Sequence, residues 1–243
     1  MEWYEAAFDR LYPVLYSHRD SREAETALNS FGRCFEGKTP VLDLASGDGR
    51  YLEALLQRGV DAYGLDLSHY LLARSAAEWG HGGRLVQADM RHLPFCDGSF
   101  GGALNMFTSF GYFSVDTDNL LVFREVQRVL KGDGVFLFDF INAERIANEL
   151  LEESSRESQG YEIHERRRIE GHGKYLVKRA EVTNKRTNDK EEIEERLRLY
   201  TLADLVMMFE SVGLIPREFY GDYMGNAFAR GVSERVIILS AKP

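Results

Sequence analysis

Residues 40–50 read PVLDLASGDGR. An apolar run, VLDL, ends in a turn that contains Gly47 and Gly49. A short apolar run followed by a glycine-rich turn is typical of a buried strand, and residues 51–58 continue with helical spacing. Strand, tight turn and helix in this order form the repeating unit of a parallel α/β sheet.

The same unit recurs twice downstream. AYGLDLS at residues 62–68 and LVQADM at residues 85–90 resemble VLDL in placing an aspartate at the end of an apolar run, so Asp43, Asp66 and Asp89 are 23 residues apart. That interval accommodates one strand and one crossover helix. Because the carboxyl ends of parallel strands meet at one edge of a sheet, we expect three carboxylates along that edge. An acidic edge suits a ligand that is rich in hydroxyls and amines and poor in phosphate.

Further elements extend the pattern to a complete sheet. A turn at residues 131–134 leads to a fifth strand, and the last two strands are joined by a connection too short for a crossover helix, so they should pair antiparallel. The chain therefore predicts an α/β fold, a doubly wound and mostly parallel sheet with an antiparallel last strand. The predicted strands are 41–44, 61–67, 84–88, 103–106, 135–140, 214–220 and 235–240, and the helices are 51–58, 70–79 with Ser68 as its N-cap, 115–129 and 202–212.

Two segments lie outside this sheet. The first 35 residues predict two helices, with Pro13 breaking or kinking the first. Residues 160–200 alternate polar and apolar side chains, which predicts three antiparallel strands; they hold 11 basic and 9 acidic residues, so their charge is +2 against −11 for the rest. A solvated amphipathic sheet, a cap over the substrate and a dimer surface all fit that insertion. The expected divisions are a helical lid at 1–37, a core at 38–159 and 201–243, and an inserted antiparallel β subdomain at 160–200.

Composition excludes several classes of protein. The 243 residues are 44% hydrophobic and 28% charged, and no apolar stretch approaches the ~20 residues of a membrane span. A net charge of −9 makes nucleic acid an unlikely partner. Cys34 and Cys96 show neither metal-ligand spacing nor a disulfide framework, and the N-terminus lacks the pattern of a signal peptide. We therefore expect a cytoplasmic protein without a metal site.

Four motifs occur in order between residues 40 and 140: VLDLASGDGR, AYGLDLS, QADMRHLPF and RVLKGDGVFLFDF. In this order they resemble the motifs of class I S-adenosylmethionine-dependent methyltransferases, of the small-molecule type with an inserted β cap. The resemblance implies a Rossmann-like, seven-stranded sheet with an antiparallel last strand, and S-adenosylmethionine as the cofactor. A nicotinamide-dependent dehydrogenase fits less well, because its loop requires a third glycine where this sequence has Leu52.

The resemblance also implies a cofactor site. Gly47 and Gly49 would let the backbone approach the methionine part of the cofactor, and Ala45 stands where the family has its first loop glycine. Asp66 would accept hydrogen bonds from both ribose hydroxyls. Taken alone, strand-end aspartates and glycines serve as turn and helix caps. The other implied contacts are Asp43 with the amino group, Leu67 and Met90 with adenine, Asp89 with the adenine amine, Asn105 and Phe107 beside the methionine chain, and Tyr16 and Arg19 with the carboxylate.

The acceptor pocket should be formed by residues 108–113 and 139–142, with parts of 160–200 and 220–230 closing it. These segments are aromatic and sparsely polar, which favours a small organic acceptor with an N, O or C nucleophile. Methyl transfer depends chiefly on alignment, and a general base is needed only where the acceptor must lose a proton. No compact motif identifies a catalytic residue; the candidates are Tyr112, Asp139, His164 and Tyr223.

Two other functions stay open at this stage. A protein with the same cofactor motifs could bind S-adenosylmethionine in a regulatory role without methyl transfer. Methylation of tRNA or protein is disfavoured by the net charge, although the local charge of the insertion suits an anionic partner. A homodimer is a further expectation.

Overall fold

The computed structural model describes residues 3–17 and 21–243. Its larger sheet is built from seven strands, and the order across the sheet is β10-β11-β5-β4-β1-β2-β3. Strands β1 to β5 run parallel, whereas β11 is antiparallel to both of its neighbours. The predicted doubly wound sheet with an antiparallel last strand is therefore confirmed. The strands are β1 (Val41–Leu44), β2 (Ala62–Asp66), β3 (Leu85–Gln87), β4 (Phe100–Asn105), β5 (Leu130–Ile141), β10 (Ile215–Tyr220) and β11 (Arg235–Ala241).

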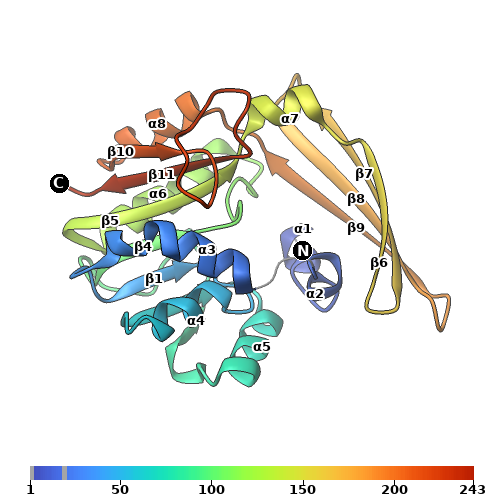
Figure 1. Cartoon of the computed structure of the whole chain (residues 1–243), viewed down its shortest axis with the longest axis horizontal. Helices are drawn as coiled ribbons and strands as arrows, with labels where there is room; N and C mark the ends of the chain where they lie inside the picture. The colour runs from blue at the N-terminus through green and yellow to red at the C-terminus, as the bar shows by residue number, and fades with distance from the viewer. Residues whose placement is uncertain (1–2, 18–20) are drawn as a thin grey trace.

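Helices cover both faces of this sheet (Figure 1). On one face lie α3 (Ser21–Phe31), the 3₁₀ turn η1 (Gly32–Phe35) and α4 (Arg50–Gln57); on the other lie α6 (Asp116–Val129) and α8 (Leu202–Ser211). Between β2 and β3 the chain forms α5 (His69–Trp79) and the 3₁₀ turn η2 (Gly82–Arg84). The hydroxyl of Ser68 accepts a hydrogen bond from the Leu71 amide, so the predicted N-cap is confirmed.

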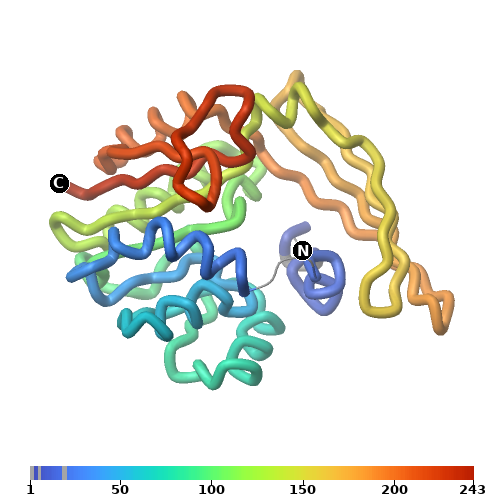
Figure 2. Tube along the Cα trace, in the orientation of Figure 1, coloured from blue at the N-terminus to red at the C-terminus, as the bar shows by residue number. Residues whose placement is uncertain are grey.

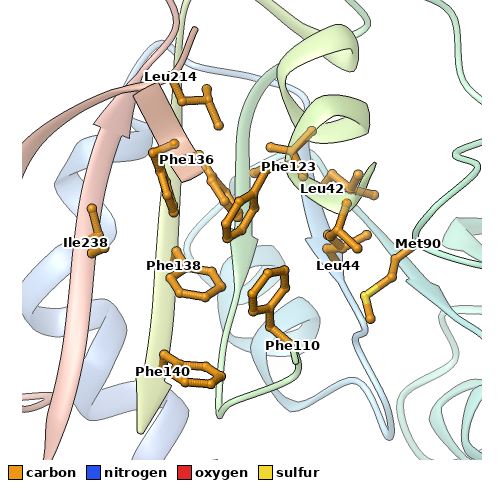
Figure 3. Close-up of a cluster of buried hydrophobic side chains, with 14 of the residues drawn as sticks. Leu42, Leu44, Met90, Phe110, Phe123, Phe136, Phe138, Phe140, Leu214 and Ile238 are labelled. Carbon is orange, nitrogen blue, oxygen red and sulfur yellow. The ribbon is translucent and has the colours of Figure 1, made fainter. Parts of the chain in front are cut away.

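Alternate residues of β5 build the two halves of the core. Phe136 and Phe138 pack against Phe123 of α6, whereas Leu137 faces the α3–α4 layer. Phe110, from the loop after β4, stacks on Phe123 with ring centroids 4.4 Å apart (Figure 3). Aromatic packing of this kind fixes the loop that follows β4, and that loop reaches the candidate site.

The ends of two strands differ from the prediction. β4 begins at Phe100, three residues before the predicted start, because Gly101 and Gly102 are also strand residues. A Cβ at Gly101 would lie 2.4 Å from a backbone carbon of Lys38. Close approach of the chain therefore explains glycine inside this strand. β5 likewise begins at Leu130, so the predicted turn at residues 131–134 lies within an irregular stretch of strand.

The second sheet has four antiparallel strands where the sequence predicted three. They follow α7 (Ala143–Glu149) and pair in chain order: β6 (Glu153–Ser158), β7 (Tyr161–Glu170), β8 (Tyr175–Asn184) and β9 (Lys190–Arg198). The missed strand, ESSRES, contains no apolar residue, so no alternation of polar and apolar side chains identifies it. Pairing with β7 holds it in place.

Two short N-terminal helices, α1 (Trp3–Ala7) and α2 (Tyr12–Leu15), lie between the two sheets (Figure 2). Pro13 lies in the first turn of α2, where proline is tolerated, so the break precedes it. Val14 and Leu15 pack on Ile163, Ala180 and Val182 of the second sheet. The third helix, α3, belongs to the core instead. None of the described helices combines the length and the apolar character that a membrane crossing requires.

Candidate functional site

A cavity of about 890 Å³ lies at the carboxyl edge of β1, β2 and β4. Its other walls come from α1 and α2 and from the inner face of the four-stranded sheet. The volume is in the upper part of the range for small-molecule sites. Of the sequence-predicted residues, the cavity lining contains Tyr16, Ala45, Gly47, Asp66, Leu67, Asp89, Met90, Phe107 and Tyr112.

The glycine-rich turn supplies the cavity floor. Ala45, Gly47 and Gly49 all have positive φ, at 59°, 55° and 83°. A Cβ added to Gly47 would meet only a methyl carbon at 4.0 Å, so any side chain there would extend into open space beside the cavity. Gly49 has a different role and does not line the cavity. A Cβ at this position would lie 2.1 Å from the Ser75 hydroxyl oxygen, so glycine is what allows the start of α4 to pack on α5.

Asp66 organises this turn from the end of β2. One carboxylate oxygen accepts from the Gly47 amide and the other from the Ser68 amide, each at 2.8 Å. Burial raises the pKa of Asp66, and these two backbone donors partly offset the rise. A carboxylate offers about four acceptor positions, so two remain for ligand hydroxyls. Leu67 follows directly and is 37% exposed toward the cavity.

Asp89 lines the cavity but is already paired. Its carboxylate accepts hydrogen bonds from the side chain and the amide of Arg91, the shortest at 2.6 Å. Burial alone would raise the pKa of Asp89, but the hydrogen bonds from Arg91 outweigh it and lower the pKa. Arg91 also stacks on Phe113. Met90 is buried beside this pair and supplies an apolar surface.

Asp43 and Asn105 lie behind the cavity. Asp43 is 2% exposed, and burial together with the nearby charge of Asp66 raises its pKa to about 7. The side-chain amide of Asn105 donates to the carbonyls of Leu44 and Ser109, which ties the end of β1 to the loop after β4. Both residues therefore support the loops after β1 and β4 from behind, and neither is part of the cavity lining.

The turn after β4 is strained and tightly held. Phe107 and Thr108 have φ of 64° and 61°, in the left-handed region that residues other than glycine rarely adopt. The Phe107 amide donates to Asp139 at 2.7 Å, and the Thr108 hydroxyl accepts from Arg235 at 2.7 Å. Arg235 also pairs with Asp139 at 2.7 Å. Both turn residues line the cavity.

Asp139 and Tyr223, two of the catalytic candidates, belong to this buried cluster. Asp139 is fully buried and accepts from the Tyr223 hydroxyl at 2.6 Å. Burial raises the pKa of Tyr223 well above its ordinary value. Neither side chain is part of the cavity lining. We therefore assign them to holding the turn at Phe107.

The aromatic candidates contribute a roof. Tyr112 donates its hydroxyl to the Thr108 carbonyl and packs against Trp3, Tyr4 and Phe8 of the N-terminal segment. Tyr16 also lines the cavity, and its hydroxyl donates to the Glu195 carboxylate at 2.6 Å. Arg19 lies outside the described residues.

His164 does not reach the cavity. It is on β7, where successive side chains alternate between faces, and Glu165 and Arg167 take the inner positions. His164 is therefore on the outer face, beside Ser155 and Glu162. The sequence-based search missed the inward-facing polar residues. For Glu165, Arg167, Lys178 and Glu195 the available signal was that they are in phase with the apolar residues of their strands. Besides these four, the missed cavity residues include Trp3, Tyr4, Phe8, Asp9, Tyr12 and Arg235.

These residues fit the cofactor that the motifs imply. The cavity side of Gly47 is free of a Cβ, and Asp66 retains acceptor capacity for hydroxyls. Met90 and Leu67 offer apolar surface to a ring. Asp43, Gly49 and Asn105 depart from the expected arrangement, because they lie behind the cavity lining. Asp89 departs from it as well, because Arg91 occupies the positions at which an amine would bind.

Comparison with known proteins supports the same interpretation. A family model described as a methyltransferase domain matches residues 42–138. YqeM of Bacillus subtilis is 31% identical over 146 residues, which are 58% of this chain and 56% of that protein. The chain spans about half the length of the relatives that it matches in sequence.

Solved structures agree over nearly the whole chain. An S-adenosylmethionine-dependent methyltransferase from Clostridium acetobutylicum superposes with a TM-score of 0.81 at 18% identity, over 96% of each chain. The CcbJ methyltransferase from Streptomyces caelestis gives a TM-score of 0.82 at 17% identity, over 100% of this chain and 99% of that one. At such low identity the agreement concerns the fold.

Proposed function

We propose that this chain, which has the class I methyltransferase fold and carries a methyltransferase domain at residues 42–138, transfers a methyl group from S-adenosylmethionine to a small organic acceptor. The observation that carries this function is the cavity at the carboxyl edge of the sheet. In one part of its wall the Gly47 amide donates to the Asp66 carboxylate at 2.8 Å, and this pair supports binding of a nucleoside with free hydroxyls. The rest of the wall is aromatic and comes from the N-terminal helices and the second sheet.

The geometry of the turn supports the following cofactor contacts. Gly47 admits the methionine chain close to the backbone, and Asp66 accepts from the ribose hydroxyls. Met90 and Leu67 flank the adenine ring. Asp89 accepts from the adenine amine only if Arg91 gives up part of its contact.

S-adenosylmethionine supplies a methyl group on a sulfonium, which is already activated for in-line displacement. The protein then needs to align the acceptor and exclude water. The turn at Phe107–Thr108 and the ring of Tyr112 are held by partly buried hydrogen bonds, so they offer a rigid surface for that alignment. The N-terminal helices exclude water above it. We propose that the four-stranded sheet is the cap over the acceptor.

Calorimetry with S-adenosylmethionine tests the cofactor assignment. Asp66→Ala should weaken binding by about 2 kcal/mol, because two charge-assisted hydrogen bonds are lost. Asp61→Ala is the matched control: Asp61 precedes the same strand at its opposite end, is 49% exposed and pairs with Arg84. Its affinity should be unchanged. Equal affinities for the wild type and Asp66→Ala would reject the ribose contact, and no binding to the wild type would reject the function.

A radioactive methyl-transfer screen separates the proposed activity from its alternatives. Uptake into small molecules supports the proposal, whereas uptake into tRNA or protein alone would replace it. Binding without transfer to any acceptor class would indicate a regulatory cofactor-binding protein. A cytoplasmic location and a homodimer stay predictions; cell fractionation and sedimentation equilibrium test them.

A further inference from the structure

A row of aromatic side chains crosses the part of the cavity wall that the N-terminal helices and the loop after β4 provide. In the middle of the row the ring centroids of Phe8 and Tyr112 are 5.2 Å apart. From Phe8 the contacts continue to Tyr12 at 5.5 Å, and from Tyr12 to Tyr16 at 4.8 Å. All members of the row line the cavity, and we call them the aromatic wall: Trp3, Tyr4, Phe8, Tyr12, Tyr16, Tyr112 and Phe113.

The aromatic wall differs from the aromatic core in its exposure. In the core, rings such as Phe123 and Phe138 are fully buried against one another. In the wall, Tyr4 and Phe113 are buried, but the other five members keep part of their surface exposed although each packs on a neighbouring ring. Apolar surface left in water is unfavourable, so a ligand that covers these rings gains binding free energy.

Several polar atoms of the wall are already used within the protein. The indole N–H of Trp3 donates to the Tyr112 carbonyl at 3.2 Å, and the Tyr112 hydroxyl donates to the Thr108 carbonyl at 2.9 Å. The Tyr16 hydroxyl donates to the Glu195 carboxylate at 2.6 Å. Each of these groups has a single hydrogen to donate. The wall therefore offers a ligand the faces and edges of rings in place of these donors.

The charged side chains that the second sheet contributes to the cavity are paired with one another. Lys178 pairs with Glu195 at 2.9 Å, and Arg167 pairs with Glu165, so two bases balance two acids. A charged group of the acceptor would have to displace one of these partners, whereas a neutral ring leaves both pairs intact. Asp9 also lines the cavity, but its exposure to solvent weakens its attraction for a cation.

We propose that the methyl acceptor is an aromatic compound whose ring stacks on Phe8 and Tyr112 of the aromatic wall. This rests on the proposed methyl transfer and specifies its substrate class. Tyr112 is bonded to the Thr108 carbonyl, so a ring stacked on it lies beside the turn at Phe107–Thr108. Stacked and edge-to-face contacts orient such a ring as well as bind it. Phe8 and Tyr112 therefore determine the specificity for a flat acceptor.

Matched aromatic and saturated rings test this class. The pairs are phenol and cyclohexanol, catechol and cis-1,2-cyclohexanediol, and aniline and cyclohexylamine, titrated by calorimetry with and without S-adenosylhomocysteine. Phenol and catechol should bind about threefold or more tightly than their saturated counterparts, as expected of ring stacking. Equal or tighter binding of the saturated member in either pair would overturn the inference.

The third pair weighs stacking against charge. Cyclohexylamine is a cation at neutral pH, which Asp9 would attract, whereas aniline is neutral. Aniline should bind more tightly, and tighter binding of cyclohexylamine would overturn the inference because recognition would then follow charge.

Methyl β-D-glucopyranoside separates an aromatic acceptor from a sugar, since the C–H face of a sugar also packs on aromatic rings. The glucoside should bind more weakly than catechol. Binding as tight as that of catechol would assign the wall to a sugar and overturn the inference.

Substitutions in the wall test where the ring binds. Phe8→Leu should bring the ratio of phenol affinity to cyclohexanol affinity close to one, whereas Phe8→Tyr, which keeps the ring, should retain the wild-type ratio. Tyr112→Leu and Tyr112→Phe form a second pair in case Phe8→Leu fails to fold. Phe95→Leu is the control outside the cavity, because Phe95 is also partly buried and packs on the ring of Phe100 at 4.9 Å. An unchanged ratio in the leucine variants that fold, or an equal loss in Phe95→Leu, would exclude the aromatic wall as the binding surface.

Failure of this inference is distinguishable from failure of the proposed function. Wild-type protein that binds S-adenosylmethionine and shows no preference for aromatic rings would retain the function and lose the substrate class. Wild-type protein that binds no cofactor but prefers the aromatic members in its absence would lose the function and retain the aromatic site.

Discussion

Asp139→Ala tests the buried cluster behind the strained turn. Asp139 is fully buried and accepts hydrogen bonds from Arg235, from the Phe107 amide and from the Tyr223 hydroxyl. The substitution removes the counter-ion of Arg235, whose side chain is only 15% exposed. It also leaves two further donors without their acceptor. We expect a large loss of stability.

The magnitude follows from the surroundings of the pair. Removing one partner of a buried ion pair costs about 3–5 kcal/mol, because the other charge stays in a poorly solvated site. Each buried donor left unpaired costs about 1–3 kcal/mol, part of which is recovered where water enters the vacated space. We therefore expect a loss of about 4–6 kcal/mol in the free energy of unfolding, against the ~5–15 kcal/mol of a typical domain.

Urea unfolding followed by circular dichroism measures this loss. Asp133→Ala is the matched control, because Asp133 is on the same strand and pairs with Lys38 but is 83% exposed; it should cost under about 1 kcal/mol. The double variant Asp139→Ala/Arg235→Met should be more stable than Asp139→Ala, since no buried charge is left alone. A loss below about 1 kcal/mol for Asp139→Ala would refute the reasoning, because it would mean that the pair is solvated.

The remaining predictions concern the glycine-rich turn and can be measured by the same unfolding assay. Ala45→Gly should stabilise the protein by about 0.5–1 kcal/mol, because Ala45 has a φ of 59° that glycine adopts without strain. Gly49→Ala should cost about 2–4 kcal/mol, because the new Cβ would lie 2.1 Å from the Ser75 hydroxyl oxygen, whereas Gly59→Ala, in open space at a φ of 74°, should cost only about 1 kcal/mol. The pKa of Asp43 is about 7 in the folded state against an ordinary 3.8, so the folded state holds the carboxyl proton more tightly than the unfolded state does. The resulting stability is fully present below about pH 4 and is lost as the pH rises through about 7. The stability difference between Asp43→Asn and the wild type should therefore grow in favour of the variant between about pH 4 and pH 7, and a constant difference would contradict the shift.

The core of the fold could be predicted because its signals are local. Each parallel strand is a short apolar run next to a turn or a cap, and the even spacing of Asp43, Asp66 and Asp89 reflects one crossover per strand. The antiparallel last strand followed from the length of its connection alone. Features of this kind depend on neighbours in sequence, so a single chain is enough to reveal them.

Other features depend on neighbours in space, and these were missed. β6 contains no apolar residue and is a strand only because β7 pairs with it. The predicted strand began at residue 103 and left out Gly101, whose lack of a Cβ serves the approach of Lys38 from a distant part of the chain. Asp139 was a candidate base until its partner Arg235, 96 residues away, showed it to be a buried counter-ion.

Within the second sheet, the choice of site residues depends on which face is covered. β7 carries charged residues on both faces, so composition does not distinguish His164 from Glu165. Alternation does: Glu165 and Arg167 share their face with Ile163, which α2 covers, whereas His164 shares its face with exposed ion pairs. A charge that is in phase with apolar residues is held away from water, and it requires a partner in the protein or in a ligand. By that criterion Glu165 and Arg167 were the residues of this strand to examine, and His164 was a surface residue.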